Sequence, residues 1–186
     1  NNFSNIKVAE RIGADLDLPI YLENDADARA IAEKYFGIGR KYTNFVHITV
    51  MEGIGASIVS GGSHFRNDAY AGEFGHMTID FNGRPCGCGN RGCIESYSSI
   101  RAIKEIVSSK VGMELTWEDI VDRAKENDII CTEIVKTSIK YLGYGLISFI
   151  NMFQPKSIVI GGRFTELGED FILGDLNRII EERFIL

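Results

Sequence analysis

The sequence predicts an α/β lobe built on a β-sheet. Short runs rich in β-branched residues have the length and composition of strands, at 45–50, 56–59 and 157–160. Longer segments carry apolar residues at helical spacing, at 98–109, 116–125 and 128–152. Strands combined with long apolar helices indicate helices packed on a sheet.

The remaining segments predict further elements around this sheet. Apolar residues at helical spacing predict a helix over 5–17, and Pro19 opens a short strand at 20–22. An Ala-rich helix follows over 26–36 and is ended by glycines. Gly61-Gly62 is a hairpin signal, and a last helix runs from about 165 to the end with an interruption near Gly174.

Charge and composition exclude several classes of function. The chain has 186 residues, a formal charge of −6 and a pI near 5.1. DNA affinity draws on Lys and Arg that neutralise phosphates, so this balance argues against a nucleic-acid surface on these residues. Without a long apolar run or a signal-peptide pattern, we expect a cytoplasmic protein that does not contact membranes. The chain lacks an initial Met and stops within a helical pattern, so we expect a fragment of a longer protein.

Three of the four cysteines lie within eight positions of a Gly-rich segment, and with a nearby histidine they form His76-x9-Cys86-x-Cys88-x4-Cys93. One imidazole and three thiolates are a donor set for four-coordinate zinc. The alternatives are incidental cysteines in a flexible loop, or a disulfide with one cysteine left over. Cys86 and Cys88 are too close for a comfortable disulfide, and the cytosol would reduce it. The set predicts a structural zinc, because protein ligands fill all four positions.

Motifs along nearly the whole chain resemble the ROK family, which takes its name from repressors, open reading frames and sugar kinases. Glu73-Phe74-Gly75-His76 is followed by Cys-x-Cys-Gly-x-x-Gly-Cys-x-Glu, the most specific part of the match. The other matching motifs are Glu23-Asn24-Asp25-Ala26-Asp27-Ala28, Asn151-Met152-Phe153-Gln154-Pro155 and Ile158-Val159-Ile160-Gly161-Gly162.

This resemblance implies an actin-like, ribonuclease-H-like fold of two lobes, with a central mixed sheet flanked by helices. Residues 1–186 would form the C-terminal, sugar-binding lobe. The N-terminal lobe with its Asp-x-Gly-x-Thr phosphate loop would lie outside this chain. So would the winged helix-turn-helix of repressor members and the last helices of the lobe.

The resemblance also implies which residues contact a monosaccharide: Asn24, Asp25, Glu73, His76 and Glu95. Carboxylates and amides suit this role, because they accept from and donate to adjacent hydroxyls. In a kinase, Asp25 would be the catalytic base that takes the proton of the attacking hydroxyl.

Each of these residues also has a simpler interpretation. Asn24 and Asp25 are favoured as a helix N-cap, and Glu95 is an acid suited to the start of a helix. Both roles are compatible with sugar contact. His76 would place one ring nitrogen on zinc and the other toward the pocket.

A kinase using ATP and Mg²⁺ would hold the nucleotide at two glycine pairs, Gly53 with Gly55 and Gly161 with Gly162. In kinase members the loop corresponding to 49–56 reads like Leu-Gly-Thr-Gly-Ile-Gly-Gly-Gly. Here Met51, Glu52 and Ala56 replace a Gly, the Thr and a later Gly. Glu52 would repel phosphates and Met51 would obstruct the close approach of backbone N–H groups. On the other side, Arg163 stands where many kinases have a third Gly.

We therefore interpret the chain as the sugar-sensing domain of a ROK repressor, with an ATP-dependent sugar kinase as the alternative. Met77-Thr78-Ile79 and Glu95-x-Tyr97-x-Ser99 also resemble repressors that sense xylose or related sugars. The sugar would shift the closure of the lobes. Closure would alter DNA binding by a module outside this chain, in a homodimer or a larger homo-oligomer. The sequence does not specify the sugar.

Three further expectations concern packing. The apolar helix 133–153 is expected to lie in the core, with a dimer face as the alternative. Cys131 is expected to be a buried free thiol. His47 and His64 are expected to be structural or solvent-facing.

Overall fold

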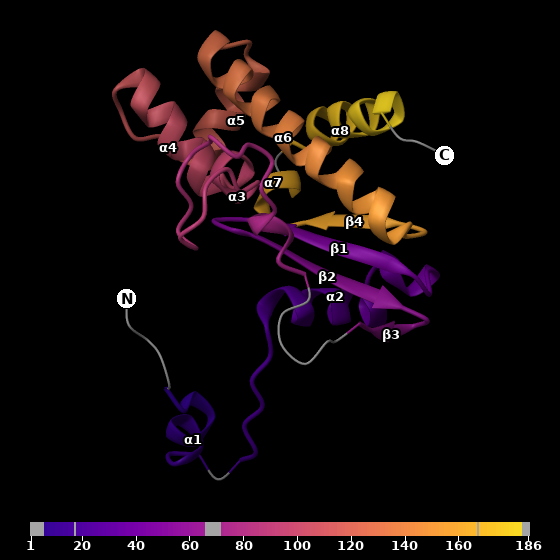
Figure 1. The fold of residues 1–186 in the computed structure, drawn as a ribbon. Helices are drawn as coiled ribbons and strands as arrows, with labels where there is room; N and C mark the ends of the chain where they lie inside the picture. The colour runs from indigo at the N-terminus through magenta and orange to yellow at the C-terminus, as the bar shows by residue number, and fades with distance from the viewer. Residues whose placement is uncertain (1–5, 17, 66–71, 167, 184–186) are drawn as a thin grey trace.

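The computed structural model describes residues 6–16, 18–65, 72–166 and 168–183. Within these residues a four-stranded sheet has the order β3-β2-β1-β4. Its strands are β1 (Phe45–Val50), β2 (Ile54–Ser60), β3 (Ser63–His64) and β4 (Ile158–Gly161). β1 pairs antiparallel with β2 and parallel with β4, so the sheet is mixed, as predicted (Figure 1).

Helices cover both faces of this sheet (Figure 1). α2 (Asp25–Phe36) lies on one face, and α6 (Ile129–Phe153) and α8 (Glu169–Arg183) lie on the other. α3, α4 and α5 pack against α6, and α7 connects β4 to α8; their bounds are Glu95–Ser98, Ile100–Val111, Trp117–Lys125 and Arg163–Glu166. Two short 3-10 helices, η1 (Ile38–Lys41) and η2 (Phe74–His76), complete the lobe, and α1 (Val8–Gly13) stands apart from it.

β1 is buried along its whole length because both of its faces are covered. Val46, Ile48 and Val50 belong to the main core, together with the inner face of α6. Phe45 points to the other face and packs with Val59 and Val159. Four of its six residues are apolar, and the two polar ones, His47 and Thr49, are buried as well because neither face of the strand is open to solvent.

α6 is the central helix of the core, as predicted. The Asp128 side chain accepts the backbone N–H of Cys131 at 2.8 Å and begins the helix, and Gln154, with φ 43°, ends it before Pro155. Its buried residues include Ile139, Leu142 and Leu146. Cys131 is fully buried as a free thiol, as predicted.

The two histidines outside the metal motif, His47 and His64, have structural roles, one of the two alternatives predicted for them. His47 is buried on β1, and its Nδ1 lies 3.3 Å from the Thr49 hydroxyl. Burial is the main cause that lowers the pKa of His47, opposed by Glu33 and assisted by Arg29. The part-buried His64 Nε2 lies 2.8 Å from the Asp27 carboxylate and so connects the β2–β3 hairpin to α2.

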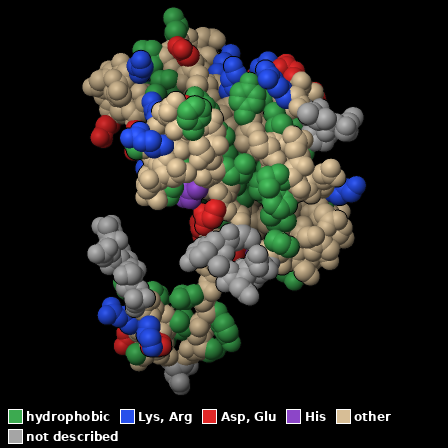
Figure 2. Space-filling view, in the orientation of Figure 1, with side chains coloured by type: hydrophobic (Ala, Val, Ile, Leu, Met, Phe, Trp, Pro, Cys, Tyr) green, Lys and Arg blue, Asp and Glu red, His purple; other side chains and the backbone are tan. Residues whose placement is uncertain are grey.

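The N-terminal predictions were wrong in extent. The helix predicted over 5–17 is helical only from Val8 to Gly13, with residues 5 and 17 outside the described residues. Its apolar residues are exposed (Ile12 by 44%), because none of the described residues of the lobe packs on them (Figure 2). The strand predicted at 20–22 is absent, because no neighbouring strand among the described residues offers it hydrogen bonds; Tyr21 is 88% exposed.

Three boundaries also differ from the predictions. The second strand begins at Ile54 rather than 56. The helix predicted over 98–109 is α4, separated from α3 by Ser99, whose extended backbone and side chain cap α4. α8, which begins at Glu169, continues through Gly174 without the predicted interruption. Burial of Ile172, Leu176 and Ile179 against the core outweighs the cost of one glycine in a helix, about 1 kcal/mol. Residues 184–186 lie outside the described residues.

Across the described ranges, the structure contains no helix with the length and apolar character required to span a bilayer.

The first turn of α2 packs directly on β2 at Gly55. A Cβ at Gly55 would lie 2.9 Å from the Cβ of Ala26, closer than real Cβ atoms approach. Gly55 is therefore needed because the helix backbone lies so close to the strand. This contact places Asn24 and Asp25 beside the start of β2.

We expect Gly55→Ala to lower the free energy of unfolding by about 1–3 kcal/mol, because it overpacks this contact. The same substitution in an Ala26→Gly background should cost much less, because the space of one methyl group is restored. Urea unfolding of the parent, the two single variants and the double variant gives the coupling free energy between positions 26 and 55. Equal costs of Gly55→Ala in both backgrounds would contradict the packing explanation.

Candidate functional site

A pocket of about 460 Å³ lies where the start of α2, the β1–β2 turn (residues 51–53) and the start of α3 meet. The structure brings four of the five predicted sugar-contacting residues into its lining, together with one predicted glycine pair: Asn24, Asp25, Glu73, Glu95, Gly53 and Gly55. His76 is the exception: it does not line the pocket, but its Nε2 lies 3.9 Å from Oε2 of Glu73, which does. The volume falls within the range of small-molecule sites.

Asn24 is both the N-cap of α2 and part of the pocket. Its Oδ1 accepts the backbone N–H groups of Ala26 and Asp27 at 2.9 and 3.3 Å. The capping interpretation is thus confirmed for Asn24, and its side-chain NH₂ can still donate to a ligand. Asp25 is the first residue of α2, so its carboxylate lies at the positive end of the helix dipole.

Glu95 begins α3 and is the most buried acid of the pocket, with its side chain 13% exposed. Its Oε2 accepts the backbone N–H of Ile54 at 2.9 Å, and its Oε1 accepts from Arg101 Nη2 at 3.2 Å. A Cβ at Gly53 would lie 2.9 Å from Glu95 Oε2. The close approach of this carboxylate therefore requires a residue without a side chain at position 53.

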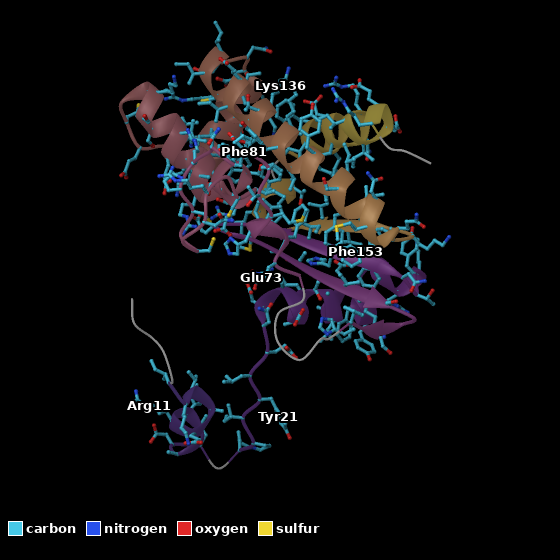
Figure 3. The ribbon with its side chains drawn as sticks, viewed as in Figure 1. Arg11, Tyr21, Glu73, Phe81, Lys136 and Phe153 are labelled. Carbon is cyan, nitrogen blue, oxygen red and sulfur yellow. The ribbon has the colours of Figure 1, made fainter. Side chains whose placement is uncertain are left out.

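The imidazole of His76 lies between the pocket and the cysteine cluster. Its Nε2 is 3.9 Å from Glu73 Oε2, and its Nδ1 is 3.6 Å from Cys86 Sγ. Figure 3 shows Glu73 at the edge of the lobe. One ring nitrogen thus faces the cysteine cluster and the other faces Glu73, although His76 itself does not line the pocket.

The donor atoms of His76, Cys86, Cys88 and Cys93 all lie within 4.8 Å of one another. Cys88 Sγ is 3.7 Å from Cys93 Sγ. Tetrahedral zinc with Zn–S near 2.3 Å and Zn–N near 2.0 Å would separate its ligand atoms by roughly 3.5 to 3.8 Å. The residues therefore fit a four-coordinate metal in both chemistry and spacing.

The thiols of Cys86 and Cys93 differ in acidity without a metal. Burial opposes ionisation of Cys86, but hydrogen bonds from the Cys88 backbone and from the Ser96, Cys88 and Cys93 side chains lower its pKa to about 7. Burial, and then the neighbouring sulfurs, raise the pKa of Cys93 to about 12. A divalent cation between the sulfurs would favour the thiolate at all three positions.

The second glycine pair lies outside this pocket. Gly161 pairs with Thr49 across the sheet, and Gly162 follows with φ 100°. A Cβ at Gly162 would lie 2.9 Å from Met51 Cγ, so the Met51 side chain covers this turn. Arg163 forms an ion pair with Glu118, and its carbonyl accepts from Trp117 Nε1 at 2.9 Å.

Two arginines, one in the pocket lining and one beside it, were not predicted. Arg29 lines the pocket one helical turn after Asp25, and this i,i+4 spacing could have identified it. Arg101 reaches Glu95 from α4, and no local spacing indicates that contact.

A mixed sheet with helices on both faces, a Cys₃His cluster and an adjoining carboxylate-lined pocket define a lobe of the sugar-kinase type. The chain belongs to the ROK family, whose model matches residues 1–183. The xylose repressor of Bacillus subtilis is 34% identical over 167 residues, which is 89% of this chain and 43% of that protein. The chain thus spans about half the length of such relatives.

Solved structures include both branches of the family. A ROK family transcriptional regulator, a homologue of the E. coli MLC protein, matches with a TM-score of 0.85 and 31% identity. The match covers 96% of this chain and 48% of that one. A ROK family glucokinase from Streptomyces griseus, in complex with glucose and AMPPNP, matches with a TM-score of 0.87 and 25% identity, over 96% and 62% of the two chains. The fold is therefore shared by regulators and kinases, and it does not distinguish them.

Proposed function

We propose that this chain is the sugar-sensing domain of a ROK repressor and binds a monosaccharide in the pocket of Asn24, Asp25, Glu73 and Glu95. The identity to xylose repressors supports this proposal. D-xylose is the first ligand to test, because those relatives carry its name.

The observation that carries the proposal is the β1–β2 turn. The Met51 side chain lies against Gly162, and both Met51 and Glu52 line the sugar pocket. A phosphate chain would need open backbone N–H groups and positive or hydroxyl side chains at this turn. A bulky thioether and an added carboxylate oppose such binding while leaving the sugar pocket in place.

Binding would act through the sugar hydroxyls. The Asp25 and Glu73 carboxylates accept hydroxyl protons, and the Asn24 amide donates to a hydroxyl oxygen. The sugar shifts the closure of the lobes only by its differential affinity for the open and closed states. Closure then changes operator binding by a module outside this chain. Assembly as a homodimer or larger oligomer, and a cytoplasmic location, stay predictions.

The first test measures sugar binding by the intact protein. We expect Asp25→Asn and Glu73→Gln each to raise the Kd for D-xylose at least about tenfold, because hydrogen bonds to charged acceptors are lost. Glu133→Gln, an exposed acid on α6, is the matched control and should leave Kd unchanged. Calorimetry gives Kd, and a gel-shift assay should show operator release only where sugar binds. Sugar binding that is insensitive to Asp25 and Glu73 would contradict the site.

The kinase alternative has one observation in its favour, the position of Asp25 in the sugar pocket. A base there could take the proton of an attacking hydroxyl. We expect no ATP turnover with a panel of pentoses, hexoses and N-acetyl sugars in a coupled ADP-release assay of the intact protein. Rates of about 1–100 per second, typical of kinases, would overturn the sensor proposal.

The proposal also assigns a structural zinc to His76, Cys86, Cys88 and Cys93. We expect one zinc per chain by elemental analysis, and its loss in Cys86→Ser/Cys88→Ser. Cys131→Ser, which alters a buried cysteine outside the cluster, should retain the metal. Metal loss should also raise the sugar Kd, because zinc would fix the orientation of His76 beside Glu73. Zinc-free protein from a preparation without chelators would contradict the assignment.

A further inference from the structure

Arg101 lies outside the sugar pocket but contacts its most buried acid. It sits in the first turn of α4, and its side chain is 54% exposed, in two grooves next to the pocket. Its Nη2 donates to Glu95 Oε1 at 3.2 Å. A buried carboxylate is costly unless it is paired and hydrogen-bonded, and Arg101 supplies a charge of opposite sign.

The two oxygens of Glu95 have different partners. Oε1 faces Arg101, and Oε2 accepts the N–H of Ile54, the residue that follows the β1–β2 turn. The turn is attached to the same region at a second point, where the Ile100 N–H donates to the Met51 carbonyl at 2.8 Å. The segment from Glu95 to Arg101 therefore holds the turn from both of its ends.

We propose that Arg101 is a positioning residue for the sugar pocket and that Glu95 transmits sugar binding to the β1–β2 turn. Arg101 keeps the Glu95 carboxylate oriented so that Oε2 points at Ile54. Glu95 also lines the pocket, so a sugar hydroxyl that donates to Oε2 shares this oxygen with the Ile54 N–H and draws it toward the ligand, which lengthens the bond to Ile54. Sugar binding thereby loosens one of the two attachments of the turn. The sugar half of this inference rests on the proposed function.

This arrangement predicts a local effect rather than a global one. An ion pair with a half-exposed arginine contributes little to stability. Its loss should change the orientation of Glu95 much more than the melting temperature. The discriminating measurement is therefore amide hydrogen exchange of the segment that contains Ile54, together with the sugar Kd.

The experiment uses the intact protein and the Arg101→Gln variant. We expect faster exchange at Ile54 in the sugar-free variant, a Kd for D-xylose raised about tenfold, and a nearly unchanged melting temperature. Arg101→Lys should partly restore the slow exchange at Ile54 and the low Kd for D-xylose, because it keeps the positive charge. Lys110→Gln, an exposed cation near the end of the same helix, is the control and should change neither. In the parent protein, saturating D-xylose should also speed exchange at Ile54.

A double-mutant cycle with Glu95→Gln tests the route of the effect. If Arg101 acts through Glu95, Arg101→Gln should add nothing to the Kd or the exchange rate of Glu95→Gln. Additive effects, or unchanged exchange at Ile54 in Arg101→Gln, would overturn the inference. If no sugar binds the parent protein, the proposed function and the sugar half of this inference fail, while exchange in the sugar-free proteins still decides whether Arg101 positions Glu95.

Discussion

The close contact between Ala26 on α2 and Gly55 on β2 determines where the pocket forms. It places the N-terminus of α2 against the start of a central strand, so that Asn24 and Asp25 face the β1–β2 turn. A larger residue at either position would move the helix end away from Glu73 and Glu95. The polar groups of the site are thus held by apolar packing, which is stiffer than their own mutual contacts.

This constraint changes the meaning of the glycines in the turn region. In the sequence, Gly53 and Gly55 resemble parts of a phosphate-binding loop. In the structure each has a steric cause, because Glu95 approaches Gly53 and Ala26 approaches Gly55. Neither glycine therefore indicates nucleotide binding by itself. Met51 and Glu52 have no such steric cause, and it is on these two positions that the proposal of a sensor depends.

The cysteine cluster is connected to the pocket through two chain segments, one before the cysteines and one after them. His76 joins the cluster to Glu73, and Glu95 follows Cys93 by two residues. A metal in the cluster would fix both of these acids without touching a ligand. Regulators and kinases of the family share this fold, so the fold alone does not determine the chemistry.

The sequence by itself determined the elements whose signals are local. Helical periodicity predicted α2 and α6, a short run rich in β-branched residues predicted β1, and the spacing of His76 and the cysteines predicted the cluster. Tertiary structure decided everything that depends on a partner distant in the chain. Residues 20–22 have strand composition but no neighbouring strand, and Gly174 stays helical because the residues around it are buried on the core. Likewise Arg101 acquires its role only because α4 folds back beside Glu95, and no local pattern records a contact made across two helices.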